Sequence, residues 1–212
     1  MITIVPAILT NSLVELENQL ERVNGLFPYV HIDVMDGEFV KNKSFREISR
    51  LPKIFTAMQF ELHLMVNDPI KHMREWQPVE QVFRVLIHRE AKTETINSIS
   101  FAKKEGWEIG LVLKPDTDLN EAKPFFDKID VLQFMTVHPG KQGAEFQKSV
   151  LPKIKEFSSI PHHPRCAADG AINLSTIKQL HENGVEIFNV GSALMGAPDI
   201  KKALADLYKA LS

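Results

Sequence analysis

Eight short apolar runs alternate with segments of helical periodicity along the whole chain. The runs cover residues 3–9, 29–35, 59–66, 81–88, 108–113, 131–137, 165–169 and 187–190. Strands separated by helices pair in parallel, and right-handed crossovers of that number close a sheet into a barrel. We therefore predict an α/β protein with one domain, a (β/α)8 TIM barrel that takes up residues 1–212.

Helical periodicity fills the connections between these runs. The first helix is expected from Leu13 to Val23 behind a cap at Asn11 or Ser12, and residues 44–50 are only weakly helical. An open doubly wound sheet is the alternative fold. No G-x-G-x-x-G or Walker-type loop follows the first strand, which disfavours it. The other predicted helices cover residues 70–76, 96–104, 119–126, 146–157, 174–182 and 199–211.

Composition narrows the functional classes. The formal net charge is −2, with 25 basic and 27 acidic residues interspersed among the 212. This balance argues against a nucleic-acid-binding or membrane-surface protein. The single cysteine, Cys166, excludes an intrachain disulfide and fits a reducing compartment. There is no secretory leader pattern and no apolar run of about 20 residues, so we expect a cytoplasmic protein.

Two of the apolar runs, residues 29–35 and 59–66, carry a histidine and a methionine at alternate positions. Because successive side chains of a strand point to opposite faces, His31, Asp33 and Met35 share one face, and His63 and Met65 repeat the pattern on the next strand. Buried ionisable groups are expected to be hydrogen-bonded, to bind a metal or to take part in chemistry. The alternative to a functional site is a strand whose polar face is exposed to solvent.

Chemistry in a barrel of this kind gathers at the carboxyl ends of the strands. His31 and Asp33 from the second strand, His63 from the third and Asp169 from the seventh are expected to meet there. Two imidazoles and two carboxylates suit one borderline divalent metal, Zn²⁺, Fe²⁺, Co²⁺ or Mn²⁺. Because the ligand set contains no thiolates, a closed structural zinc site is disfavoured. A metal that keeps coordination positions open for substrate oxygens would be catalytic.

Three methionines and two more histidines are expected at the carboxyl ends of the strands, at the same level of the barrel as the four metal-binding residues. Met35, Met65 and Met135 would form a soft collar around the metal, although methionine is usually core filler. His88 and His138 either orient a metal ligand or make ordinary hydrogen bonds.

Glycine-containing turns follow the last three strands, at residues 138–143, 169–171 and 191–192. The loops after strands seven and eight, with the start of a short extra helix, are where this fold commonly holds phosphate. Taken singly, each of these turns is an ordinary connection between a strand and a helix. Together they favour a phosphorylated small molecule.

Six stretches of the sequence match the motifs of one known family: Pro6-Ala7-Ile8-Leu9, His31-Ile-Asp33-Val-Met35-Asp36-Gly37-Glu-Phe39-Val40, His63-Leu-Met65-Val66, Met135-Thr-Val-His-Pro139-Gly140, Asp169-Gly170 and Val190-Gly191-Ser192-Ala193. Through them the chain resembles the ribulose-phosphate 3-epimerase family from end to end. This resemblance implies a metal-dependent epimerase of the pentose phosphate pathway, acting on a small-molecule sugar phosphate. The enzyme would interconvert D-ribulose 5-phosphate and D-xylulose 5-phosphate. Since relatives are often dimers or larger assemblies, we also expect a homo-oligomer.

The resemblance implies roles for individual residues. His31, Asp33, His63 and Asp169 would hold one divalent metal, and Asp33 and Asp169 would be the two acid/base residues. Inverting a carbon next to a ketone requires two such groups on opposite faces, with the metal stabilising an enediolate. The expected substrate-binding residues are Ala7, Met35, His63, Met65, Met135, Gly140, Lys141, Gln142, Gly143, Gly170, Ala171, Gly191 and Ser192.

The departures from the family pattern all fall on the side of the site expected to bind substrate, whereas the expected metal ligands and acid/base residues match the pattern. Ala7 stands where a serine is usual, Lys141 and Gln142 alter the loop after the sixth strand, and Ala171 replaces a glycine. Lys114 also stands where an asparagine is usual. Two alternatives therefore stay open: the same chemistry on another ketose phosphate, such as a six-carbon one, or a barrel that binds a sugar phosphate without turnover.

Overall fold

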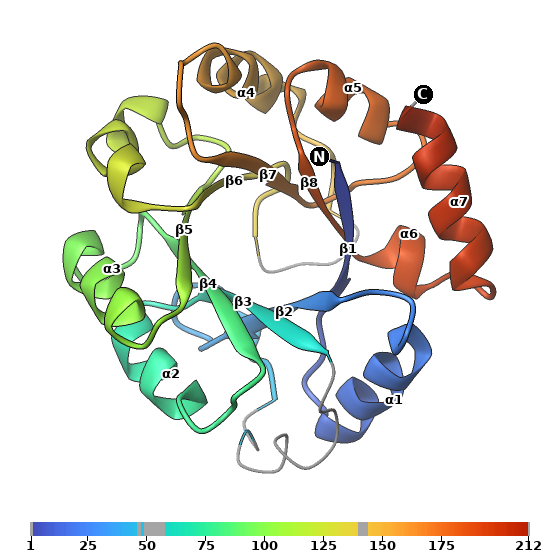
Figure 1. Cartoon of the computed structure of the whole chain (residues 1–212), viewed down its shortest axis with the longest axis horizontal. Helices are drawn as coiled ribbons and strands as arrows, with labels where there is room; N and C mark the ends of the chain where they lie inside the picture. The colour runs from blue at the N-terminus through green and yellow to red at the C-terminus, as the bar shows by residue number, and fades with distance from the viewer. Residues whose placement is uncertain (1, 46–47, 49–57, 140–143, 212) are drawn as a thin grey trace.

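Eight parallel strands form a closed barrel in the computed structural model, which describes residues 2–45, 48, 58–139 and 144–211 (Figure 1). Each strand pairs with the next, and β8 pairs with β1, which closes the sheet. The predicted (β/α)8 barrel is confirmed, and the open sheet is excluded. The strands are β1 (Thr3–Ile8), β2 (Tyr29–Met35), β3 (Gln59–Met65), β4 (Val82–His88), β5 (Glu108–Leu113), β6 (Val131–Met135), β7 (Arg165–Asp169) and β8 (Ile187–Val190).

Helices form a ring outside the barrel (Figure 1). The hydroxyl of Ser12 accepts a hydrogen bond from the Glu15 N–H and so begins the first helix; Asp68 caps the second in the same way. None of the helices in the described part of the chain is long and apolar enough to cross a membrane. The helical elements are α1 (Leu13–Val23), α2 (Pro69–Trp76), α3 (Thr95–Lys104), η2 (Leu119–Glu121), η3 (Lys123–Lys128), η4 (Lys148–Val150), α4 (Leu151–Ser158), α5 (Ile177–Glu182), α6 (Ser192–Met195) and α7 (Ile200–Leu211).

Three predicted helices differ from the structure. The segment 119–126 is two 3₁₀ pieces, with Pro124 near the start of the second, where proline lacks the N–H that a continuing helix needs. The helix predicted from residue 146 begins only at Leu151, because the Gln147 N–H donates to the Thr136 carbonyl at the end of β6. The helix predicted from residue 174 begins at Ile177, after a turn in which Asn173 accepts from the Ser175 N–H. Most of the weakly helical segment 44–50 lies outside the described residues.

The barrel strands have an outer face toward the helices and an inner face toward the barrel axis. On the outer face, the strands and helices bury a large apolar cluster. Inside the barrel, a smaller apolar cluster draws on β1 and on β4 to β8, with Val5, Val112 and Ile187 among its members. The inward positions of β2 and β3 instead carry buried ionisable residues, including His31 and His63. The polar side of the interior therefore marks where the functional site lies.

Candidate metal centre and active site

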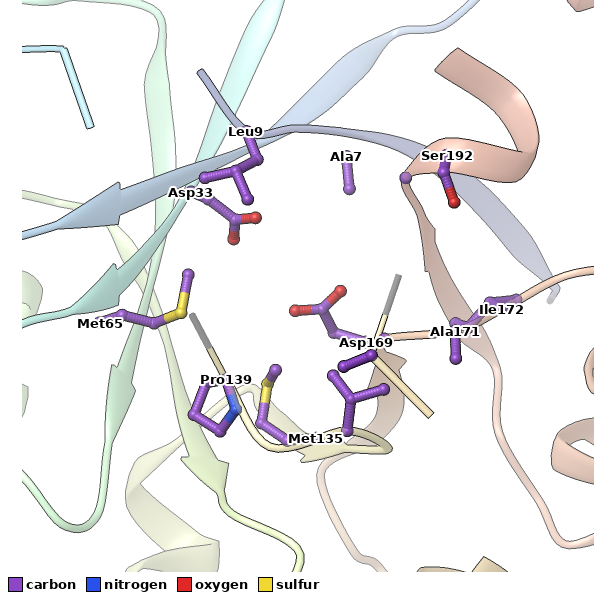
Figure 2. A pocket seen from close by; sticks show the side chains of 14 residues that line it. Ala7, Leu9, Asp33, Met65, Met135, Pro139, Asp169, Ala171, Ile172 and Ser192 are labelled. Atoms are coloured by element: carbon purple, nitrogen blue, oxygen red, sulfur yellow. The ribbon is translucent and has the colours of Figure 1, made fainter. Parts of the chain in front are cut away.

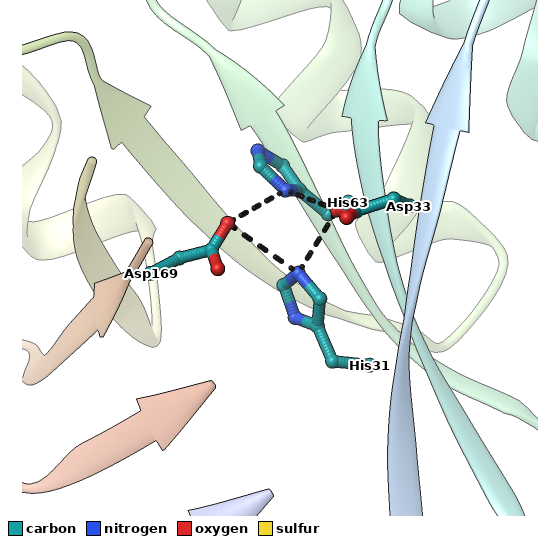
Figure 3. A group of neighbouring side chains, drawn as sticks. All are labelled: His31, Asp33, His63 and Asp169. Atoms are coloured by element: carbon teal, nitrogen blue, oxygen red, sulfur yellow. Dashed lines mark hydrogen bonds and ion pairs between the residues drawn. The ribbon is translucent and has the colours of Figure 1, made fainter. Parts of the chain in front are cut away.

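Four ionisable side chains converge inside the carboxyl end of the barrel (Figure 3). His31 and Asp33 come from β2, His63 pairs with Asp33 in register from β3, and Asp169 ends β7 on the opposite side. One ligand atom from each of the four lies within 4.8 Å of the others. The structure thus brings together the ligand set that the sequence singled out. His31 lies in the middle of β2, deeper than the strand end where it was expected.

The two histidines face the centre of this cluster through different ring nitrogens. His63 Nδ1 lies 2.9 Å from Asp33 Oδ1 and 3.3 Å from Asp169 Oδ2. His31 Nε2 lies 3.4 Å from Asp33 Oδ1 and 3.9 Å from Asp169 Oδ2. An ion at the centre would therefore meet Nε2 of His31, Nδ1 of His63 and one oxygen from each carboxylate.

The electrostatics of the cluster fit a cation. Burial disfavours a charged His31 ring, but the carboxylates of Asp33, Glu61 and Asp169 outweigh it and raise the pKa of His31 to about 10. Burial opposes ionisation of Asp33, yet the two histidines hold the pKa of this carboxyl far below its usual range. His31 Nε2 is buried without a well-formed hydrogen bond from any described residue. Imidazole nitrogens and carboxylate oxygens are the donors that borderline divalent metals accept.

The outer nitrogens of both rings are also engaged. His31 Nδ1 lies 2.8 Å from Glu61 Oε1, and His63 Nε2 lies 3.0 Å from His88 Nε2. His88 Nδ1 in turn lies 3.2 Å from Glu90 Oε2. The sequence left the role of His88 open between orienting a metal ligand and making an ordinary hydrogen bond. Its hydrogen bond to His63 is compatible with both.

His138, the other histidine whose role was open, lies outside the cluster. Its side chain is 60% exposed and its Nδ1 lies 3.8 Å from Asp116 Oδ2. Sequence reasoning assigned no role to Glu61, Arg84 or Glu90. Glu61 could have been found, because it lies two residues before His63 and therefore on the same strand face. Arg84 carries a similar signal, because it lies four residues before His88 in the same predicted strand, whereas Glu90 lies beyond that strand.

A pocket opens above the cluster, and the carboxylates of Asp33 and Asp169 point into it from opposite sides (Figure 2). Met65 and Met135 line the pocket, whereas Met35 packs beside it with Val40, so two of the three methionines expected as a collar face the pocket. His63 is fully buried beneath it. The lining residues are Ala7, Leu9, Asp33, Met65, Met135, Val137, Pro139, Ala144, Asp169, Gly170, Ala171, Ile172, Gly191 and Ser192.

The turns after β7 and β8 form the far wall of this pocket. Gly170 and Ala171 both have positive φ, 109° and 48°, a conformation that costs little for glycine but is unfavourable for alanine. Gly191 precedes the short helix α6, which Ser192 begins. Ala7 presents only a methyl group to the pocket. Four residues expected to bind substrate, Gly140, Lys141, Gln142 and Gly143, lie outside the described part of the chain.

Comparison with known proteins decides the family. The model of the ribulose-phosphate 3 epimerase family matches residues 3–195. The chain belongs to this family. It is therefore an enzyme of the isomerase class, and the resemblance seen in the sequence is confirmed.

Relatives in this epimerase family match along nearly their whole length. The chain is 32% identical over 214 residues to ribulose-phosphate 3-epimerase of Bacillus subtilis, which covers 98% of both chains. It is 28% identical over 209 residues to ribulose-phosphate 3-epimerase of Schizosaccharomyces pombe, over 96% of this chain and 91% of the relative.

Solved structures share the barrel at lower identity. The 3-hexulose-6-phosphate synthase of Salmonella typhimurium superposes with a TM-score of 0.74 at 17% identity, over 99% of this chain and 98% of the other. The 3-keto-L-gulonate-6-phosphate decarboxylase of Vibrio cholerae gives a TM-score of 0.72 at 18% identity, over 100% and 96%. At such identities the likeness concerns the fold.

Proposed function

We propose that this epimerase interconverts D-ribulose 5-phosphate and D-xylulose 5-phosphate by proton transfer at C3, with Asp33 and Asp169 as the two acid/base residues. One observation carries the proposal: the two carboxylates enter the pocket from opposite sides, one from β2 and one from β7 (Figure 2). A sugar between them would expose one face of C3 to each.

The reaction requires the two carboxylates to be in different protonation states. The carbon next to a ketone is inverted when one group removes its proton and the other returns a proton to the opposite face. One carboxylate must begin ionised and its partner protonated. The neighbouring histidines hold the pKa of Asp33 far below its usual range, so this carboxylate is ionised, the state in which the base must begin. Asp169 would then be the acid, and the roles exchange in the reverse reaction.

His31 Nε2, His63 Nδ1 and the carboxylates of Asp33 and Asp169 would hold one divalent metal, Zn²⁺, Fe²⁺, Co²⁺ or Mn²⁺. When bound, the metal supplies positive charge against the negative charge that develops on the substrate oxygens. His31 Nε2 is buried beside both carboxylates without a well-formed hydrogen bond, which supports this assignment.

The far wall of the pocket would hold the substrate's phosphate. Ala171 and Ser192 lie across the pocket from Met65 (Figure 2), and their neighbours Gly170 and Gly191 also line the pocket. Loops after strands seven and eight of a barrel bind phosphate through backbone N–H groups and the start of a short helix. A pentose phosphate anchored there would extend its C3 toward the two carboxylates. Met65 and Met135 would shield the reacting carbon from water.

A second candidate is the same chemistry on a different ketose phosphate, such as a six-carbon one. It is favoured by Ala7, whose methyl group offers no hydrogen bond to the substrate, and by Ala171, whose methyl group occupies a position that suits glycine. A barrel that binds sugar phosphate without turnover is the third candidate. The described residues supply both carboxylates that turnover needs, which favours the first two.

One assay separates these candidates. Purified, metal-loaded protein is given ribulose 5-phosphate in D₂O, and formation of xylulose 5-phosphate and exchange of the C3 proton are followed by NMR. We expect both. If there is no reaction with the pentose but C3 exchange on a six-carbon ketose phosphate, the second candidate is correct. Binding without exchange on either substrate would contradict the assignment of Asp33 and Asp169 as acid and base.

A further inference from the structure

A row of four ionisable side chains crosses the barrel interior beneath the metal centre. Neighbouring strands place these residues side by side: His31 of β2 pairs with Glu61, Glu61 of β3 with Arg84, and Arg84 of β4 with Glu108 of β5. The β3–β4 register shifts between Phe60 and Glu61, so that Glu61 lies opposite Arg84. Such irregularities re-aim side chains next to active sites.

The row is joined by short contacts. His31 Nδ1 lies 2.8 Å from Glu61 Oε1, and Arg84 Nη1 donates to Glu61 Oε2 at 2.6 Å. On its other side, Arg84 donates from Nε to Glu108 Oε2 at 2.7 Å. The two oxygens of Glu61 thus serve two different donors, one on each neighbouring strand.

This row is costly to bury, and its burial needs a reason. The Glu61 side chain is 1% exposed and that of Arg84 is 6% exposed, while Glu108 is 48% exposed. Buried ion pairs repay their desolvation poorly, and apolar residues at such positions are often as stable. Elsewhere the described interior of the barrel holds apolar side chains such as Val112 and Ile187, and the uncharged amides of Gln133 and Asn189, which hydrogen-bond to each other. Stability alone therefore does not explain the row.

We propose that Glu61 is a positioning residue of the metal centre and that Arg84 holds Glu61 in place for this role. When a metal displaces the Nε2 proton of His31, the Glu61 carboxylate at Nδ1 would keep the other proton on Nδ1, so that the lone pair of Nε2 is directed at the ion between Asp33 and Asp169. Arg84 occupies the second oxygen of Glu61 and so prevents the carboxylate from turning away from His31. The inference rests on the proposed metal centre.

The test compares the same substitution at the two ends of Arg84. In Glu61→Gln, the amide has one acceptor oxygen for two donors, so the contact to His31 or the contact to Arg84 is lost, while Arg84 keeps Glu108. In the control, Glu108→Gln, the change also touches Arg84 but no metal ligand. Full-length protein is stripped of metal and titrated with Zn²⁺ against a chromophoric chelator, and the visible spectrum of the Co²⁺ form is recorded.

We expect Glu61→Gln to bind Zn²⁺ about 10- to 100-fold more weakly, the range found for residues that orient metal ligands. Its Co²⁺ spectrum should also change. Glu108→Gln should stay within about twofold of the wild type. Equal affinities of Glu61→Gln and wild type would overturn the inference. A wild-type protein that binds no divalent metal would overturn the proposed metal centre and this inference with it.

A double variant covers the case in which Glu61→Gln does not fold. Glu61→Leu with Arg84→Met removes both buried charges together and leaves the half-exposed Glu108 to water. We expect it to keep the unfolding temperature of the metal-free wild type and still to lose affinity for Zn²⁺ about 10- to 100-fold. A purely structural role predicts that metal affinity follows the unfolding temperature instead. Wild-type affinity in the double variant would contradict the inference.

Discussion

The Nε2 atoms of His63 and His88 lie 3.0 Å apart, in two buried rings that stack with their centroids 5.1 Å apart. Nδ1 of His63 donates toward the two aspartate carboxylates, and although burial opposes charge on this ring, the same carboxylates raise the pKa of His63, which favours a proton on Nε2 as well. Burial is the main cause that lowers the pKa of His88 to about 4, so its ring is neutral at pH 7. The Nδ1–H of His88 donates to Glu90, and its Nε2 accepts from His63. The contacts with His63 and Glu90 therefore set the tautomer of His88.

Replacing His88 with phenylalanine should destabilise the protein by about 1–3 kcal/mol, because the Nε2–H of His63 would remain buried without an acceptor. The phenyl ring would still pack on Phe39, whose ring centroid lies 4.7 Å from that of His88. The free energy of unfolding is measured in urea on metal-free protein. A variant as stable as the wild type would show that this hydrogen bond contributes nothing.

Asp33→Asn and Asp169→Asn should each lower kcat/KM for epimerisation by at least about 10²–10⁴-fold, because each removes one of the two proton-transferring groups. Both variants should fold, since an amide replaces a carboxylate of the same size. The matched control is Asp127→Asn, an exposed residue that pairs with Lys128, and it should be fully active. Near-normal turnover in either site variant would remove that residue from the mechanism.

Removing the metal with a chelator should abolish epimerisation and lower the unfolding temperature. A ligand bound only by the folded state at 100 times its dissociation constant stabilises that state by about 2.7 kcal/mol. Adding Zn²⁺, Co²⁺ or Mn²⁺, or Fe²⁺ without oxygen, should restore both properties. The measurement is calorimetry of the stripped and reloaded protein. An unfolding temperature insensitive to both treatments would contradict the assignment of the cluster.

Glu90 should make the stability of the protein depend on pH. Burial opposes its ionisation, but hydrogen bonds from His88, Thr117 and the Lys114 N–H outweigh burial and lower the pKa of Glu90 to about 2 from 4.5. Because the pKa of Glu90 is lower in the folded than in the unfolded protein, ionised Glu90 stabilises the folded state above pH 4.5. This contribution to the free energy of unfolding is lost as the pH falls toward 2. Between pH 6 and pH 4 the loss is about 0.8 kcal/mol.

The comparison with Glu90→Gln isolates this contribution. The difference in unfolding free energy between wild type and variant should shrink by about 0.8 kcal/mol from pH 6 to pH 4. Urea denaturation at the two pH values measures it. A difference that is constant, or that grows as the pH falls, would show that Glu90 has no lowered pKa in the folded protein.

Cys166 should not react with thiol reagents while the protein is folded. Its side chain is fully buried in β7, and burial raises the pKa of the thiol well above its usual range. Because the thiolate is the reactive form, labelling by a disulfide reagent should require unfolding. One thiol should titrate in denaturant and almost none in native buffer. Complete labelling of the folded protein within minutes would contradict this placement.

The sequence alone determined the fold class and the residue types of the cluster. Strands of a parallel barrel are covered on both faces and read as short apolar runs, so their number and alternation with helices could be counted. The four ionisable residues stood out because they interrupt such runs. Helix boundaries were less predictable, because Pro124 and the hydrogen bonds of Gln147 and Asn173 change the local backbone.

Only the tertiary structure decided how the cluster is oriented. His31 turns Nε2 toward the cluster because its Nδ1 contacts Glu61 of the neighbouring strand β3. His63 turns Nδ1 toward the cluster because its Nε2 contacts His88 of β4. The contact between Glu61 and Arg84 depends on a register shift that the sequence does not mark. The rotation of a ring and the register of two strands are set by partners distant along the chain, and these partners meet only when the barrel closes.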